Sequence, residues 1–154
     1  MCTLRTHLRH RAQLLQHRAS HILHIQKALH QMNVQLTQVL TDVTSATGLA
    51  ILRAIGAGEY DPLTLARLHN SACKSSEEKI IKALTGNWQP EHLFVLKQSL
   101  ELYDFYTAQV AACDVELERY FTALKPRYEP AAEDLAGRAL PRATGLHEQE
   151  PARL

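Results

Sequence analysis

Residues 1–43 read MCTLRTHLRHRAQLLQHRASHILHIQKALHQMNVQLTQVLTDV, and their apolar pattern sets the architecture of the whole chain. The apolar residues recur every seven positions. If Met1 is position a of the heptad, the a positions are Met1, Leu8, Leu15, Ile22, Leu29, Leu36 and Val43, and the d positions are Leu4, Arg11, Arg18, Ile25, Met32 and Val39. Spacings that alternate between three and four residues are typical of a long helix that packs along a partner helix. No Pro or Gly occurs before Gly48, so the sequence predicts one helix over 1–43, about 65 Å long at about 1.5 Å per residue.

The next part of the chain, residues 44–90, predicts a compact insert of three short helices. The first covers 49–56 and ends at Gly56 and Gly58. Asp61-Pro62 is a helix start, with Asp as the N-cap and Pro at the first helical position. Ser75 with Glu78 predicts a capping box at the start of the third helix.

A second long helix is predicted over 91–125, about 50 Å long by the same rise. Its apolar positions keep the alternating spacing, with gaps at Thr107 and Asp114; they are Leu93, Leu96, Leu100, Tyr103, Val110, Leu117, Phe121 and Leu124. Two such helices joined by a compact insert predict an all-α protein: a long antiparallel coiled-coil hairpin with a small three-helix insert at its tip.

The pattern ends after Lys125. Pro126, Pro130, Pro141 and Pro151 interrupt a stretch rich in Ala, Arg and Glu, and we expect 126–154 to be a disordered tail.

Length and composition favour one cytoplasmic domain of 154 residues. No run of 18 apolar residues predicts a membrane span, and the first residues do not resemble a signal peptide. Cys2, Cys73 and Cys113 are isolated, which fits a reducing compartment.

The net charge of +1 conceals an asymmetry. Residues 1–41 hold five Lys or Arg residues and no carboxylate, whereas residues 91–125 carry a local charge of −3. The two long helices therefore either attract each other or hold a basic face towards a polyanion. On the second interpretation the phosphate contacts are Arg5, Arg9, Arg11, Arg18 and Lys27. On the first, Arg11 and Arg18 pack their stems in the seam and reach solvent or a carboxylate of the second helix, with Glu116 and Glu118 near that end.

Six of the nine histidines lie between His7 and His30. His17, His21 and His24 have spacings that could hold a metal ion, but no carboxylate or Cys accompanies them. We therefore expect a solvated polar face, with nucleic-acid contact as the alternative, and no metal and no cofactor. Trp88 is expected to anchor the insert against the hairpin, with a partner contact as the alternative. No catalytic motif is present, and contact with a second copy of the chain is assigned to Leu8, Leu15, Ile22, Ile25, Leu29, Met32 and Leu36.

Four phrases in order carry a family resemblance over residues 3–125. They are HIQKAL at 24–29 with QMNVQL at 31–36; TGLAILRAI at 47–55 with AGE at 57–59 and DP at 61–62; GNWQPEHLF at 86–94; and ACD at 112–114. Together they resemble the middle section of the RuvC-type (DEDD) insertion-sequence transposases, the insertion-sequence family numbered one hundred and ten, which is related to the Piv DNA invertases.

The resemblance implies a protein of three parts: a RuvC-like nuclease domain with four acidic metal ligands, a coiled coil, and a domain with a catalytic serine. Such proteins recombine DNA, some of them guided by a structured RNA. No catalytic residue of either outer part maps onto this chain, so we expect a truncated, non-catalytic transposase fragment that keeps the oligomerising, nucleic-acid-adjacent coiled coil. The expected partners are a second copy or a full-length transposase, and DNA or structured RNA, with no membrane and no small-molecule substrate. The alternative is a free-standing interaction protein that regulates a full-length transposase by mixed dimerisation.

Overall fold

The computed structural model describes residues 2–69 and 75–124, which contain α-helices and no β-strand. The helices are α1 (Cys2–Gln31), α2 (Leu36–Val39), α3 (Ala46–Gly56), α4 (Pro62–Ala66), α5 (Glu77–Ala83) and α6 (Pro90–Ala123). The fold described below belongs to the compact unit Met1–Phe121. The tail predicted at 126–154 lies outside the described residues. Within the described ranges, no helix combines the length and apolarity that crossing a membrane requires.

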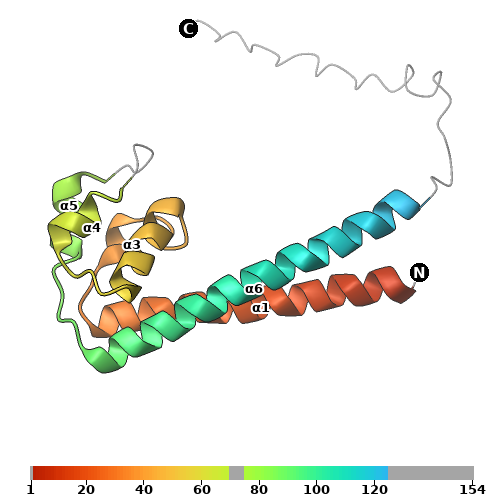
Figure 1. The fold of residues 1–154 in the computed structure, drawn as a ribbon, viewed down its shortest axis with the longest axis horizontal. Helices are drawn as coiled ribbons and strands as arrows, with labels where there is room; N and C mark the ends of the chain where they lie inside the picture. The colour runs from red at the N-terminus through yellow and green to blue at the C-terminus, as the bar shows by residue number, and fades with distance from the viewer. Residues whose placement is uncertain (1, 70–74, 125–154) are drawn as a thin grey trace, which may run out of the picture. The chain divides into compact units, whose positions relative to one another are not determined.

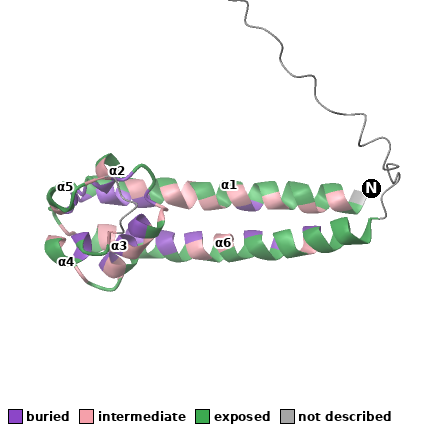
Figure 2. Ribbon diagram, turned by 90° about the horizontal axis from the view of Figure 1, so that it is seen from above, coloured by how far each residue is buried: buried purple, intermediate pink, exposed green. Residues whose placement is uncertain are grey.

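Helices α1 and α6 lie side by side and run in opposite directions (Figure 1), so the predicted antiparallel hairpin is confirmed. Buried residues face the space between the two helices along their length (Figure 2). Near the open end, Leu14 packs against Val110, Cys113 and Leu117. Near the insert, Ile25 and Leu29 share the main core with Leu96 and Leu100, and all four are at most 6% exposed.

The seam of α1 is rotated from the predicted a and d positions towards d and g. The g residues Leu14 and Ala28 are buried, whereas Leu8, at an a position, is 47% exposed. Positions d and g also alternate by three and four residues, so they too form a continuous stripe along one side of a helix. The rotation brings polar d and g side chains against α6; they are His7, Arg11, Arg18 and His21.

Helix α1 ends at Gln31, about twelve residues before the predicted end. Asn33 has a φ of 56°, the left-handed conformation that closes a helix. The amide of Asn33 donates to the carbonyl of His30 at 3.0 Å, and the amide of Val34 donates to that of Leu29 at 2.9 Å. This is a Schellman motif, in which Asn substitutes for the more common Gly. Leu36 and Val39, which the repeat predicts to continue α1, form α2 instead, and α2 packs against α5, so the insert of the structure starts at α2 and not at residue 44.

The insert is held to the hairpin by a core that draws on every helix. Its fully buried members within the insert include Leu36, Ile51, Leu52, Ile55, Leu65, Ile80 and Leu84. Each such side chain contributes roughly 1.5–3 kcal/mol before the entropy of ordering the chain is subtracted. Two backbone hydrogen bonds fix the insert to the end of α1: Gln35 N to Ala83 O at 2.9 Å, and Asn87 N to Met32 O at 2.8 Å. The three predicted short helices correspond to α3, α4 and α5.

Of the two predicted helix starts in the insert, one is confirmed and one is wrong. The Asp61 carboxylate accepts from the amide of Thr64 at 2.9 Å and caps α4, with Pro62 at its first position. The N-cap of α5 is Ser76, which makes no side-chain cap bond. Ser75 instead donates its hydroxyl to the carbonyl of Val39 at 2.5 Å. A tertiary hydrogen bond therefore takes the place of the predicted capping box.

Candidate functional site

The outward side of α1 carries cations and no anion. Helix α1 contains no carboxylate over its 30 residues, and Arg5, Arg9 and Lys27 are exposed. Arg5 and Arg9 are one turn apart, and Lys27 follows Arg9 by 18 residues, which is five full turns of 3.6 residues. The three side chains therefore leave the helix on the same side, over roughly 33 Å of its length.

The other two cations assigned to phosphate contact lie in the seam. The guanidinium of Arg11 forms an ion pair with Asp114 through Nε and Oδ1, and its Nη2 lies 3.3 Å from Oδ2. The hydrogen bond from Arg11 lowers the pKa of Asp114, and the same bond raises the pKa of Arg11. Arg18 places its guanidinium carbon 6.0 Å from the centre of the Tyr103 ring. The structure thus brings Arg11 to a carboxylate of α6, as one interpretation predicted, but to Asp114 and not to Glu116 or Glu118.

Two imidazole rings of α1 stack on an aromatic ring of α6. Tyr106 of α6 has His17 on one side, at a centroid distance of 5.5 Å, and His21 at 5.4 Å, both nearly parallel to it. The Nδ1 atom of His21 is buried and has no hydrogen-bond partner among the described residues. Burial lowers the pKa of His21, and His24 and His17 lower it further. In the ranges that the structure describes, no three side chains are arranged to hold a metal ion.

The residues assigned to contact between copies divide into two groups. Ile25, Leu29, Met32 and Leu36 are not exposed at all, because they form the core of this chain. Leu8 is exposed, and Leu15 and Ile22 are half-buried. A contact between copies must therefore use other residues than the four in the core.

Helix α6 has a second apolar face, directed away from α1, which we call the outer stripe. Phe105 is 53% exposed, Val115 is 51% exposed and Leu102 is 43% exposed. Ala108 and Ala112 continue the face between them and are also exposed. Exposed apolar side chains that recur at helical spacing mark a surface for another helix.

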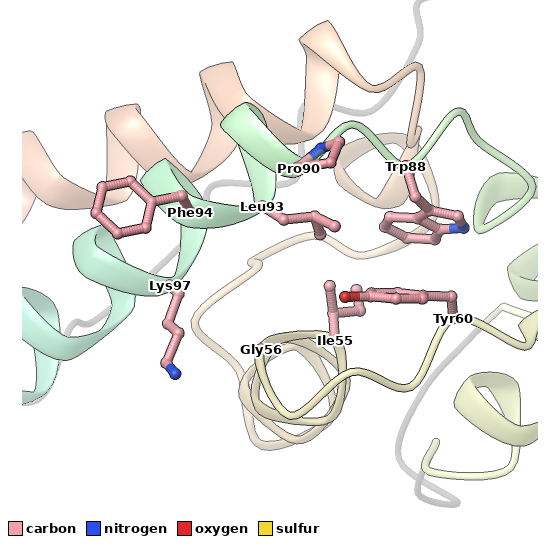
Figure 3. A pocket seen from close by; sticks show the side chains of 8 residues that line it. All are labelled: Ile55, Gly56, Tyr60, Trp88, Pro90, Leu93, Phe94 and Lys97. Carbon is pink, nitrogen blue, oxygen red and sulfur yellow. The ribbon is translucent and has the colours of Figure 1, made fainter.

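An aromatic groove lies where the insert meets the start of α6 (Figure 3). It has a volume of about 520 Å³ and is lined by Ile55, Gly56, Tyr60, Trp88, Pro90, Leu93, Phe94 and Lys97. The rings of Tyr60 and Trp88 stack at 5.3 Å with 28° between their planes. Trp88 also packs on the main core, so the predicted anchoring of the insert is observed.

Sequence reasoning missed the partners that come from distant parts of the chain. Asp114 is a gap in the apolar pattern of the second long helix, and such a gap is a sequence signal of a polar partner across the seam. Tyr60, Phe94 and Lys97 carried no such signal, because the groove joins segments about 30 residues apart in the sequence. No family model, curated protein or solved structure matches this chain.

Proposed function

We propose that this chain is the coiled-coil section of a transposase of the RuvC-type insertion-sequence family, and that it acts as a non-catalytic arm that contacts nucleic acid. The observation that carries the proposal is the outward side of α1, where Arg5, Arg9 and Lys27 stand on a helix without any carboxylate. The assignment to the transposase family rests on the resemblance of the four sequence phrases quoted above. On this proposal Arg11 and Arg18 hold the hairpin together and do not contact phosphate.

Salt-dependent binding tests this proposal. Fluorescence anisotropy would follow the full chain binding to a 30-base-pair DNA duplex, and separately to an RNA hairpin, between low and moderate salt. Each phosphate contact adds roughly 0.9 to the slope of log K against log salt on duplex DNA. Replacing Arg5, Arg9 and Lys27 together by Gln should therefore reduce that slope by about 2 to 3.

A matched control changes the same charge elsewhere. Arg67, Lys79 and Lys82 are exposed cations of the insert, and their triple Gln variant should keep the wild-type slope. If both triple variants lose the same affinity, net charge alone drives binding and the assignment to α1 is wrong. If neither duplex nor hairpin binds at low salt, the nucleic-acid proposal itself is wrong.

A second candidate function is regulation of a full-length transposase by mixed dimerisation, and the outer stripe of α6 favours it. The double variant Phe105→Glu, Val115→Glu should abolish the association of this chain with a second copy or with a full-length relative, measured by sedimentation equilibrium. The reason is that two charges would be buried in an apolar contact. Leu23→Glu, at a 64% exposed position of α1, is the control and should leave association unchanged. A wild-type chain that stays monomeric up to high concentration and does not bind a full-length relative would rule this function out.

A further inference from the structure

The aromatic groove is built from three segments that the fold brings together. Ile55 and Gly56 end α3, Tyr60 follows them, and Trp88 with Pro90 leads into the first turns of α6. In Figure 3, Tyr60 and Trp88 form one end of the groove, and Phe94 and Lys97 lie at the other. Tyr60 is 38% exposed and Phe94 is 60% exposed, so the groove is open to solvent along its length. An open groove suits an extended chain segment better than an enclosed small molecule.

The aromatic wall of the groove is fixed before any ligand arrives. Tyr60 stands between Glu59 and Asp61, and the Asp61 amide donates to the Glu59 carboxylate at 2.9 Å. Trp88 follows Asn87, whose amide donates to the carbonyl of Met32 at 2.8 Å. The two rings then stack on each other. A wall that is already ordered loses little conformational entropy when a partner binds.

The two ends of the groove differ in charge. Lys97 is exposed at the Phe94 end and forms no ion pair with any carboxylate in 2–69 or 75–124. At the other end, the lining residues Tyr60 and Trp88 carry no charge. A polyanion such as single-stranded nucleic acid would therefore meet only one cation among the residues that line the groove. A peptide that carries its negative charge at one end only matches this distribution of charge.

We propose that this groove binds an extended peptide of a partner protein in which a Leu or Phe side chain is followed directly by one or two carboxylates. The apolar side chain lies against Tyr60, Leu93 and Phe94, and the carboxylate pairs with Lys97. The site is independent of the phosphate-contacting side of α1, so either can exist without the other.

Peptide binding to the full chain tests this proposal. The probe is a fluorescein-labelled peptide, Gly-Ser-Gly-Leu-Phe-Asp-Glu-Gly-Ser-Gly, and the comparison peptide has Lys-Lys in place of Asp-Glu. We expect the acidic peptide to bind at least about tenfold more tightly, and Phe94→Ala to weaken it by about tenfold, which is the effect of losing one apolar contact. Lys97→Glu should reverse the preference between the two peptides, because it reverses the charge at that end.

Two further measurements keep the result specific. Phe94 and Lys97 are exposed, so their variants should keep the wild-type circular dichroism spectrum, and Lys79→Glu on α5 should leave both peptide affinities unchanged. Equal binding of the two peptides, or an acidic-peptide affinity that Phe94→Ala does not change, would overturn the proposal. Binding of a twelve-residue oligothymidine that Phe94→Ala abolishes would also overturn it, since the occupant would then be nucleic acid.

Discussion

Replacing Gly86 by Ala should destabilise the protein, because the end of α1 packs directly on this position. A Cβ atom built at Gly86 would lie 2.6 Å from Val34 Cγ2 and 2.7 Å from Met32 O. Both distances are shorter than real Cβ contacts. The Met32 carbonyl cannot withdraw freely, since it also accepts the amide of Asn87 at 2.8 Å.

The size of the effect follows from two opposing contributions. Forcing an extra methyl into a packed site costs about 1–3 kcal/mol. Exchanging Gly for Ala also restricts the unfolded chain, which returns about 0.4–1 kcal/mol. The net loss is about 1–2 kcal/mol, which should lower the Tm by roughly 3–8 °C in a protein of this size.

Thermal unfolding followed by circular dichroism at the helix band measures this loss, and Gly56→Ala is the matched control. A Cβ at Gly56 meets nothing within 4 Å, and the residue ends α3. The control should raise the Tm by about 1–4 °C, because only the unfolded-state and helix-propensity contributions remain. If Gly86→Ala unfolds at or above the wild-type temperature, the close contact between residue 86 and the end of α1 does not exist in solution.

Three further predictions concern the end of α1 and the polar part of the seam. Asn33→Gly should raise the free energy of unfolding in urea by about 0.5–1 kcal/mol, since Gly adopts the left-handed conformation without strain; an unchanged value would argue against the Schellman end. The advantage of wild type over Asp114→Asn should be present at pH 7 and should shrink as the pH falls through the lowered pKa of Asp114, because the protonated carboxyl group no longer forms an ion pair with Arg11; an advantage that does not decrease on acidification would contradict it. The lowered pKa of His21 predicts that stability falls as the pH drops below about 6.5, where the unfolded chain takes up protons first; urea titrations of wild type and His21→Phe between pH 8 and 5 should show a smaller pH dependence in the variant.

The hairpin could be predicted from the sequence because its signal is long and repetitive. The apolar spacing of three and four residues persists through 93–124, and the charge asymmetry between the two helices agrees with it. The end of α1 could not be placed, because the repeat continues through Leu36 and Val39 while the chain turns at Asn33. Leu36 is buried in either arrangement, so its apolar character does not distinguish a longer helix from a new one.

The rotation of the seam was hidden for a related reason. In α1 the a positions are the more apolar, yet the d and g positions face α6. The heptad pattern predicts that the most apolar side of α1 faces the partner helix. In the structure, the side that faces α6 is the one whose polar residues find partners on α6. Arg11 finds Asp114, and Arg18 and His21 find the rings of Tyr103 and Tyr106. Such pairings depend on a partner helix about a hundred residues away in the sequence. The apolar repeat of α1 alone therefore does not show which of its residues face α6.

The polar side chains between α1 and α6 also fix the register in which the two helices pair. If one helix slid by a heptad, Arg11 would face Thr107 or Phe121, and Arg18 would face Leu96 or Val110. None of those four residues offers Arg11 a carboxylate, and neither Leu96 nor Val110 offers Arg18 a ring, so a slide by one heptad would lose both contacts, whereas a seam of leucines alone would keep its apolar contacts. We therefore expect α1 and α6 to keep one register, so that a displacement of their open end moves the two helices together and is not absorbed by one helix sliding along the other.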